Sequence, residues 1–182
     1  PVTEDDASVA SSPYAVSKLL VELQAEYYAR RGLDTVVARP FNHIGPGQGS
    51  GFLVPDLTAA LRALRPGEAL TVGNLDTARD YTDVRDVARA YHLLAFAEAH
   101  ERPLYNIASG SAHTGREVLA VIADELGVAV PSLRVDEGRL RPGDPLRITG
   151  SAERLHAELG WTPTIDWATS VRESVRASTH SS

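Results

Sequence analysis

Short segments rich in β-branched residues alternate along this chain with longer segments of helical periodicity. Asp34–Arg39 and Leu104–Ala108 are predicted to be core strands, and Ala69–Val72 a shorter one. The predicted helices cover residues 12–31, 53–64, 84–97, 115–126 and 151–160, and a last helix begins after Asp166. This alternation indicates an α/β fold with parallel strand pairing.

Two core strands do not complete a parallel sheet, because such a sheet needs cover on both faces and neighbours at both edges. The further strands are not found in these 182 residues. The sequence also contains no methionine, not even at position 1. We therefore expect residues 1–182 to be the C-terminal portion of a single larger unit whose N-terminal half is missing.

Composition argues against several classes of protein. A net charge of −6 and the lack of a basic run argue against nucleic acid as a partner. No apolar stretch reaches the roughly 20 residues of a membrane span and no signal-peptide pattern is present, so no membrane contact is expected. The absence of cysteine fits a reducing cytoplasm, and six scattered histidines without ligand spacing predict no metal site.

Lys18 is the only lysine, and every other basic residue of the chain is an arginine. Arginine replaces lysine on a solvated surface, but not where a compact ammonium has to fit among hydroxyl groups. Lys18 follows Tyr14 by four residues, so both side chains should project from one helix face. A neighbouring cation favours the charged form of a phenol. Tyr14 is therefore a candidate general acid or base for a sugar hydroxyl; an exposed lysine beside a core tyrosine is the structural alternative.

Three loops carry side chains suited to a nucleotide-sugar. The glycine-rich segment Asn42–Gln48 follows a predicted parallel strand, at the end where α/β folds bind ligands. The other two loops present Arg79 and Arg141, whose guanidinium groups could clamp a diphosphate. In an arginine-rich chain, either one taken alone is more simply a solvated surface charge.

Four motifs together resemble the extended short-chain dehydrogenase/reductase family: Tyr14-x-x-x-Lys18, Asn42–Gln48, Val72–Leu75 and Arg79–Asp86. The resemblance runs from about Ser11 to about Trp167 and is strongest to the GDP-4-keto-6-deoxy-D-mannose reductase branch. It implies the C-terminal half of an extended Rossmann-type fold with a doubly wound parallel sheet. It also implies a small substrate-binding α/β subdomain, formed by about 42–80 and 111–182.

The resemblance implies an NAD(P)H-dependent reduction of a GDP-linked 4-keto-6-deoxy-hexose. Tyr14 would protonate the C4 oxygen, while Lys18 would hold the nicotinamide ribose. The residues implied to contact NADP or NAD are Tyr14, Lys18, Pro40, Phe41 and His43. The residues implied to contact the GDP-sugar are Asn42, Val54, Val72, Asn74, Arg79 and Arg141.

The chain departs from this family in lacking the glycine-rich phosphate turn, the catalytic Ser/Thr expected before Tyr14 and the residue that sorts NAD from NADP. It therefore holds half of an active site. Two alternatives stay open: a nucleotide-sugar 4,6-dehydratase or 4-epimerase, and a truncated non-catalytic domain. The resemblance further implies a homodimer built on the helices at 12–31 and 53–64.

The remaining polar and aromatic candidates are assigned structural roles. His43 is expected to be a hydrogen-bonded structural residue without a part in catalysis. The acids predicted to be helix caps or loop anchors rather than metal ligands are Asp80, Asp83 and Asp86. Trp161 and Trp167 are expected to pack the C-terminal helices.

Overall fold

The computed structural model describes residues 1–10, 12–140 and 143–178. Its helices are α1 (Pro13–Ala29), α2 (Leu53–Ala63), α3 (Val84–Phe96), α4 (Gly115–Leu126), the 3-10 helix η1 (Glu137–Arg139), α5 (Glu153–Leu159) and α6 (Trp167–Ala177). Its strands are β1 (Val37–Pro40), β2 (Asn42–Ile44), β3 (Leu70–Val72), β4 (Ala78–Asp83), β5 (Leu104–Ile107), β6 (Ala112–Thr114), β7 (Leu133–Val135) and β8 (Arg147–Ile148).

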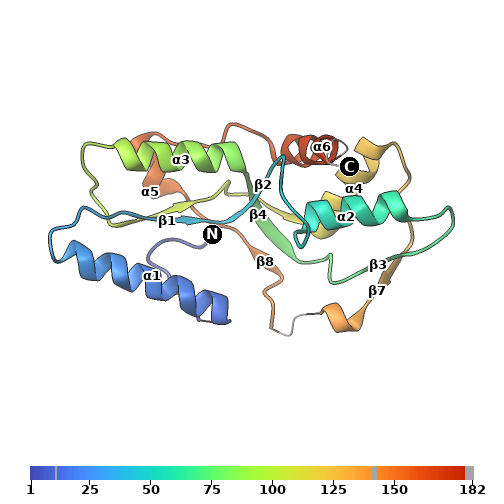
Figure 1. The fold of residues 1–182 in the computed structure, drawn as a ribbon, viewed down its shortest axis with the longest axis horizontal. Helices are drawn as coiled ribbons and strands as arrows, with labels where there is room; N and C mark the ends of the chain where they lie inside the picture. The colour runs from blue at the N-terminus through green and yellow to red at the C-terminus, as the bar shows by residue number, and fades with distance from the viewer. Residues whose placement is uncertain (11, 141–142, 179–182) are drawn as a thin grey trace.

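The strands form three small sheets that run through the middle of the molecule (Figure 1). Strands β1 and β5 pair in parallel, with Ala38 opposite Tyr105. Strand β4 is the centre of the largest sheet and lies parallel to β2 and β8 but antiparallel to β6. Strands β3 and β7 make a separate parallel pair. The largely parallel pairing confirms the α/β class that the alternation of segments predicted.

Strands β2 and β4 begin where the sequence predicted loops, so this part of the prediction was wrong, and β6 lies in a segment for which no strand was predicted. Strand β4 has the sequence Ala-Arg-Asp-Tyr-Thr-Asp, which lacks the apolar pattern of a core strand. Yet Asp80 and Asp83 on this strand are buried, because hydrogen bonds from distant segments satisfy their carboxylates. Strands β2 and β6 are three residues long, too short for a periodic signal.

One hydrophobic core lies between α2, α4, α6 and strand β3. Apolar residues at helical spacing, such as Leu57 and Leu61 on α2, point into it with Ile122 of α4 and Val171 of α6. Two of these helices, α4 and α6, begin where the sequence predicted. Thr114 forms a capping box with Glu117 at α4, and the Asp166 carboxylate accepts two backbone hydrogen bonds at α6.

A second core lies between α3, β5 and α5. Trp161, just after α5, is fully buried there, and its indole N–H donates to the backbone oxygen of Asp86 at 3.0 Å. Trp167 packs against the first core, and its ring stacks on His113 with centroids 3.9 Å apart. The packing roles predicted for both tryptophans are confirmed.

The buried acids act as caps and anchors, as predicted. Asp83 accepts a hydrogen bond from the backbone N–H of Arg85 at 2.8 Å and so caps α3, while Ser170 and the Arg85 guanidinium bind the same carboxylate. Burial raises the pKa of Asp83, but the hydrogen bonds from Arg85 and Ser170 outweigh burial and leave the pKa below its ordinary value.

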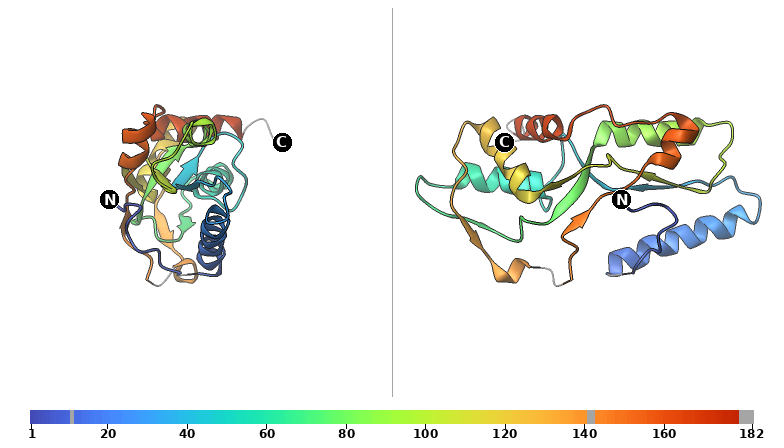
Figure 2. Two further views of the ribbon diagram at one scale, coloured as in Figure 1. Left: turned by 90° about the vertical axis from the view of Figure 1, so that its left-hand side faces the viewer. Right: turned by 180° about the vertical axis from the view of Figure 1, so that it is seen from behind.

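Helix α1 lies apart from both cores, as Figures 1 and 2 show from opposite sides. None of its residues is buried. Two contacts join it to the segment before and along β1: an ion pair between Glu22 and Arg39 at 2.5 Å, and a hydrogen bond from the Thr35 hydroxyl to the backbone oxygen of Ala25. The apolar side chains of Leu20 and Leu23 on α1 are 55% and 60% exposed. Leu19 and Leu23 line a groove together with Val37 of β1 and Leu104 of β5, so α1 turns part of its apolar surface toward these strands.

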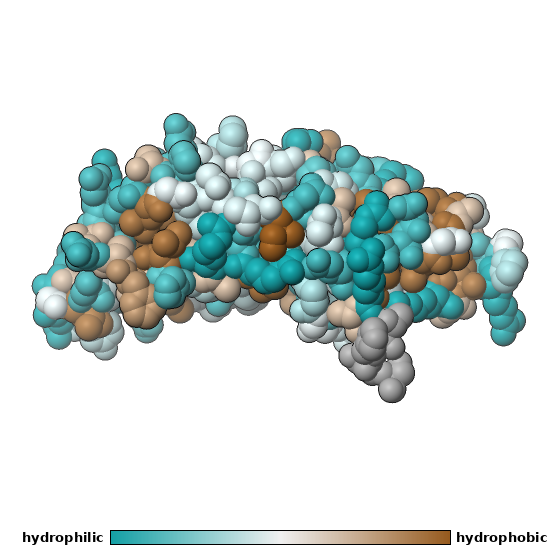
Figure 3. All heavy atoms as spheres, turned by 90° about the horizontal axis from the view of Figure 1, so that it is seen from above, coloured by the Kyte–Doolittle hydropathy of each residue, from teal (hydrophilic) through white to brown (hydrophobic). Residues whose placement is uncertain are grey.

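The opposite surface, over α3 and α6, carries alternating hydrophobic and hydrophilic areas (Figure 3). Within the described ranges, no helix is both long and apolar enough to span a lipid bilayer.

Candidate active site

Two clefts adjoin at the ends of the parallel strands. The first, here named the tyrosine cleft, has a volume of about 860 Å³ and is lined by residues that include Tyr14, Lys18, Pro40, Phe41, His43 and Tyr81. The second, here named the arginine cleft, has a volume of about 880 Å³ and is lined by residues that include Val72, Asn74, Arg79, Arg139 and Asp144. Asn42, Phe52 and Leu53 line both clefts.

The predicted catalytic pair lies on the first turns of α1. Ser12 caps this helix by accepting a hydrogen bond from the backbone N–H of Ala15, and Pro13 occupies its first position. The Lys18 ammonium lies 5.3 Å from the centre of the Tyr14 ring, so both side chains share one helix face. Tyr14 is 70% exposed and lines the tyrosine cleft. The predicted juxtaposition of phenol and ammonium is confirmed.

The wall of the tyrosine cleft opposite α1 is the end of strand β1. After Pro40, the backbone N–H of Phe41 donates a hydrogen bond to the backbone oxygen of Ile107 at 2.9 Å. The Phe41 ring packs so closely on Gly150 that a Cβ there would lie 2.6 Å from it and 2.5 Å from Ala108. Only glycine lets these segments approach this closely. The position of Phe41 in the cleft therefore depends on Gly150.

Asp80 ties three segments together beneath the clefts. Its buried carboxylate accepts hydrogen bonds from the backbone N–H groups of Ser109 at 2.8 Å, Gly110 at 3.0 Å and Gly150 at 3.1 Å. The loop after β5 and the end of β8 are thus fixed to β4. This confirms the predicted role of Asp80 as a loop anchor.

His43 is held by its own loop. Its Nδ1 lies 3.3 Å from the Phe41 oxygen, and its backbone oxygen accepts a hydrogen bond from Nε2 of Gln48 at 3.1 Å. The residue lines the tyrosine cleft. These contacts agree with the structural role expected for it.

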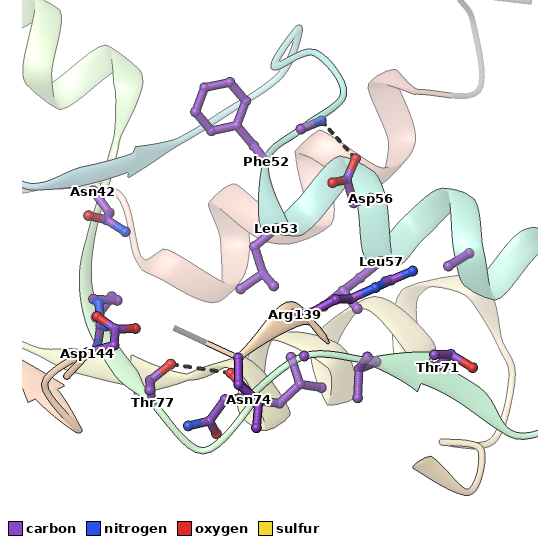
Figure 4. Close-up of a pocket in the computed structure, with 17 residues that line it drawn as sticks. Asn42, Phe52, Leu53, Asp56, Leu57, Thr71, Asn74, Thr77, Arg139 and Asp144 are labelled. Atoms are coloured by element: carbon purple, nitrogen blue, oxygen red, sulfur yellow. Dashed lines mark hydrogen bonds and ion pairs between the residues drawn. The ribbon is translucent and has the colours of Figure 1, made fainter. Parts of the chain in front are cut away.

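Arg79 forms the charged side of the arginine cleft, and its guanidinium already has protein acceptors. Nη2 donates to Asp144 at 2.6 Å, while Nη1 donates to the backbone oxygens of Pro145 at 3.0 Å and Ala78 at 2.9 Å. The side chain is 15% exposed. The ion pair joins strand β4 to the segment before β8. Asp144 and Asn42 are drawn at the end of the cleft away from Thr71 (Figure 4).

Among the described residues that line the arginine cleft, Asp56 and Asp144 are acidic and Arg79 and Arg139 are basic. Arg139 is paired with Asp136 at 3.1 Å, yet 61% of its side chain is exposed. Arg139 is thus a second cation able to meet an anionic ligand. Sequence reasoning missed it, because one arginine among many carries no signal until the fold places it.

Of the other residues predicted to contact the GDP-sugar, some line the arginine cleft and others do not. Asn42, Val72 and Asn74 line the arginine cleft with Arg79, and the Asn74 carboxamide oxygen also accepts from the backbone of Asp76. Val54 lies 1% exposed in the first core and lines neither cleft, whereas its neighbour Leu53 lines both. Arg141 lies outside the described residues.

The fold and the paired clefts define an extended short-chain dehydrogenase/reductase of the kind that includes nucleotide-sugar epimerases and dehydratases. Residues 1–174 match the family described as GDP-mannose 4,6 dehydratase, and the chain belongs to that family.

Two curated relatives illustrate its range. The chain is 37% identical to the GDP-6-deoxy-D-mannose reductase of Pseudomonas aeruginosa, an alignment that covers 97% of this chain and 58% of that protein. It is 33% identical to the UDP-glucose 4-epimerase of Azospirillum brasilense, covering 91% of this chain and 52% of that protein. The chain thus spans little more than half the length of these relatives.

A solved structure agrees with the computed fold. The structure of RMD from Pseudomonas aeruginosa complexed with NADPH superposes with a TM-score of 0.84 at 33% identity, covering 98% of this chain and 61% of that one. Other structural neighbours contain NAD. These neighbours are thus complexed with a nicotinamide cofactor.

Proposed function

We propose that this chain is the C-terminal portion of an NAD(P)H-dependent reductase that acts on a GDP-linked 4-keto-6-deoxy-hexose. One observation carries the proposal: the cleft that holds Tyr14 and Lys18 joins, at Asn42, the cleft that holds Arg79 and Arg139. A sugar bound through a diphosphate at the arginines would reach toward the phenol. The reductase relative at 37% identity favours this reaction over others in the family.

The residues of the tyrosine cleft fit the nicotinamide end of the cofactor. The fit rests on an ammonium beside a phenol on one wall, and on a strand end with an exposed imidazole on the other. Lys18 would hold the ribose hydroxyls through its three N–H donors. Pro40, Phe41 and His43 would line the side on which the ring lies. When bound, the reduced cofactor supplies a hydride to C4 of the sugar.

Tyr14 would supply the proton that completes the reduction. As the C4 carbonyl becomes a hydroxyl, its oxygen takes the phenolic proton, and the O–H bond of Tyr14 breaks to leave a phenolate. The Lys18 ammonium stabilises that phenolate electrostatically, and solvent returns the proton. Asn42, at the junction of the clefts, would hydrogen-bond a sugar hydroxyl.

The reaction is tested by incubating the intact gene product with GDP-4-keto-6-deoxymannose and NADPH or NADH. Loss of absorbance at the wavelength of the reduced cofactor, with formation of a GDP-6-deoxyhexose, is expected. The 4-epimerase relative and the family itself favour a second candidate, an epimerase or 4,6-dehydratase. Release of water from GDP-mannose without net cofactor oxidation would select the dehydratase and rule out the reductase.

Replacing Arg79 with glutamine is expected to weaken GDP binding by about 10- to 100-fold, because each hydrogen bond to a charged group contributes about 1.5 to 3 kcal/mol. Equilibrium titration of GDP into the chain measures the effect. The matched control is Arg172→Gln on α6, since Arg172 pairs with Asp124 and lines neither cleft. An Arg79→Gln protein that is folded and binds GDP as tightly as the control would remove Arg79 from the diphosphate site.

Assembly and organisation are part of the proposal. The chain covers 58% of the reductase relative, which supports the proposal that it is a portion of a larger unit. The proposed N-terminal half would carry the glycine-rich phosphate turn. The exposed apolar side chains of α1, among them Leu20, Leu23 and Tyr27, support a homodimer built on α1 and α2.

A further inference from the structure

Phe52 occupies a helix position that does not favour phenylalanine. It is the N-cap of α2, with extended backbone angles, and makes no side-chain capping hydrogen bond. Helices prefer Ser, Thr, Asp or Asn at this position. Here the Asp56 carboxylate instead accepts a hydrogen bond from the backbone N–H of Gly51 at 2.9 Å. A residue that departs from local preference at a cleft is a candidate for a functional role.

The Phe52 ring is also exposed and lies free of the other rings that the structure describes. It is 57% exposed, and within the described ranges it makes no ring contact with another aromatic or with a cation. It lines both clefts, and Figure 4 shows it at the same end of the arginine cleft as Asn42. The ring therefore presents free apolar surface at the junction.

The three residues shared by the clefts combine two kinds of chemistry. Asn42 offers a carboxamide that hydrogen-bonds no side chain or backbone group in the described part of the chain. Phe52 and Leu53 offer apolar surface only. A ligand at this point therefore meets a polar side and an apolar side. A hexose carries hydroxyls around its ring, and a 6-deoxyhexose adds one apolar group, the C6 methyl.

We propose that Phe52, with Leu53, forms the apolar contact for the C6 methyl group and makes the site selective for 6-deoxy over 6-hydroxy sugars. This inference rests on the proposed function, in which the phenol lies on one side of the hexose and the diphosphate site on the other. The hexose then occupies the junction. A C6 hydroxyl against Phe52 and Leu53 loses its water without gaining a partner, whereas a methyl does not.

The test compares GDP-6-deoxy-D-mannose with GDP-mannose, which differ only by the C6 hydroxyl. Titration calorimetry of the full chain should give about 10-fold tighter binding of the 6-deoxy sugar, since apolar pockets reject an added hydroxyl by no more than about 100-fold. Phe52→Ala should reduce this ratio to about twofold or less, and any change in the affinity for the shared GDP part cancels in the ratio. Phe52→Leu, which keeps apolar surface, should retain part of the preference.

Phe96→Ala is the matched control, because Phe96 is 75% exposed on α3 and lines neither cleft. Its preference ratio should equal that of the unsubstituted chain. Equal affinities for the two sugars, or a preference that survives Phe52→Ala, would overturn this inference while GDP binding upholds the proposed function. Failure of GDP and both sugars to bind would overturn the proposed function, and this inference with it.

Discussion

Replacing Tyr14 with phenylalanine is expected to lower kcat of the proposed full-length reductase by about 10²- to 10⁴-fold, the range that a positioned proton donor contributes. The substitution removes one oxygen from an exposed side chain, so it leaves the packing of α1 unchanged. Lys18 remains in place 5.3 Å from the ring. Steady-state measurement of cofactor oxidation gives kcat, and a GDP titration should give an unchanged Kd because the proposed diphosphate site lies in the other cleft.

Tyr27→Phe supplies the control for this prediction. Tyr27 lies on the same helix and is 49% exposed, but it does not line the tyrosine cleft. The same chemical change there should leave kcat within about twofold of the original. A Tyr14→Phe enzyme that turns over as fast as the Tyr27→Phe enzyme would show that another group protonates the sugar.

Replacing Asp86 with alanine is expected to lower the free energy of unfolding by about 3 to 5 kcal/mol, because the Thr164 hydroxyl and the backbone N–H groups of Thr164 and Ile165 lose their acceptor at about 1 to 3 kcal/mol each. The Asp86 carboxylate is 2% exposed and pairs with Arg89 at 2.6 Å. It also accepts hydrogen bonds from the backbone N–H groups of Thr164 and Ile165. Its loss therefore weakens the attachment of the segment after Trp161 to α3, leaving the hydrogen bonds from Arg89 to the Thr162 oxygen and from the Trp161 indole to the backbone oxygen of residue 86. Denaturant titration of the chain measures the change.

Asp124→Ala is the matched control. Asp124 pairs with Arg172 at 2.6 Å, but its side chain is 69% exposed, so water replaces the lost contact. Surface ion pairs of this kind contribute about 0 to 1 kcal/mol. A loss from Asp86→Ala no larger than that from Asp124→Ala would contradict the anchoring role of Asp86.

The same residue predicts a pH dependence. Burial raises the pKa of Asp86, yet hydrogen bonds from Arg89, Ile165 and Thr164 outweigh burial and leave the pKa below its ordinary value. The unfolded chain therefore takes up the proton more readily than the folded chain. The stability that this carboxylate contributes is complete above about pH 4 and is lost as the pH falls through the folded pKa. Stability should fall less steeply with acid in Asp86→Ala than in the original chain.

Helix boundaries were predictable because their signals are local. Asp83, Thr114 and Asp166 each accept hydrogen bonds from backbone N–H groups within three residues, so sequence spacing was enough to place them. Strand β4 was not predictable, because its buried carboxylates are satisfied by residues far along the chain. Ser109 and Gly150, for example, both donate to Asp80. Such long-range partners leave no periodic pattern in the sequence.

The residues of the candidate site were likewise predictable only where their signal is local. Tyr14 and Lys18 were found because a helix fixes the relation of residues four apart. Phe52, Leu53 and Arg139 were not found, because their place in the clefts depends on how α2 and η1 pack against β2 and β3. Val54 was predicted to contact the substrate, but it is buried in the core, whereas the preceding residue Leu53 lines a cleft. The sequence does not resolve this difference of one position along α2.

Helix α1 has one more consequence for the chemistry. Since no side chain of this helix is buried, its local opening costs little free energy. Proton transfer, however, requires donor and acceptor to be preorganised, and a displacement of about 1 Å can cost about 100-fold in rate. The alignment of the phenol is therefore not secured by the helix that carries it, and must be supplied by whatever surface covers the free face of α1.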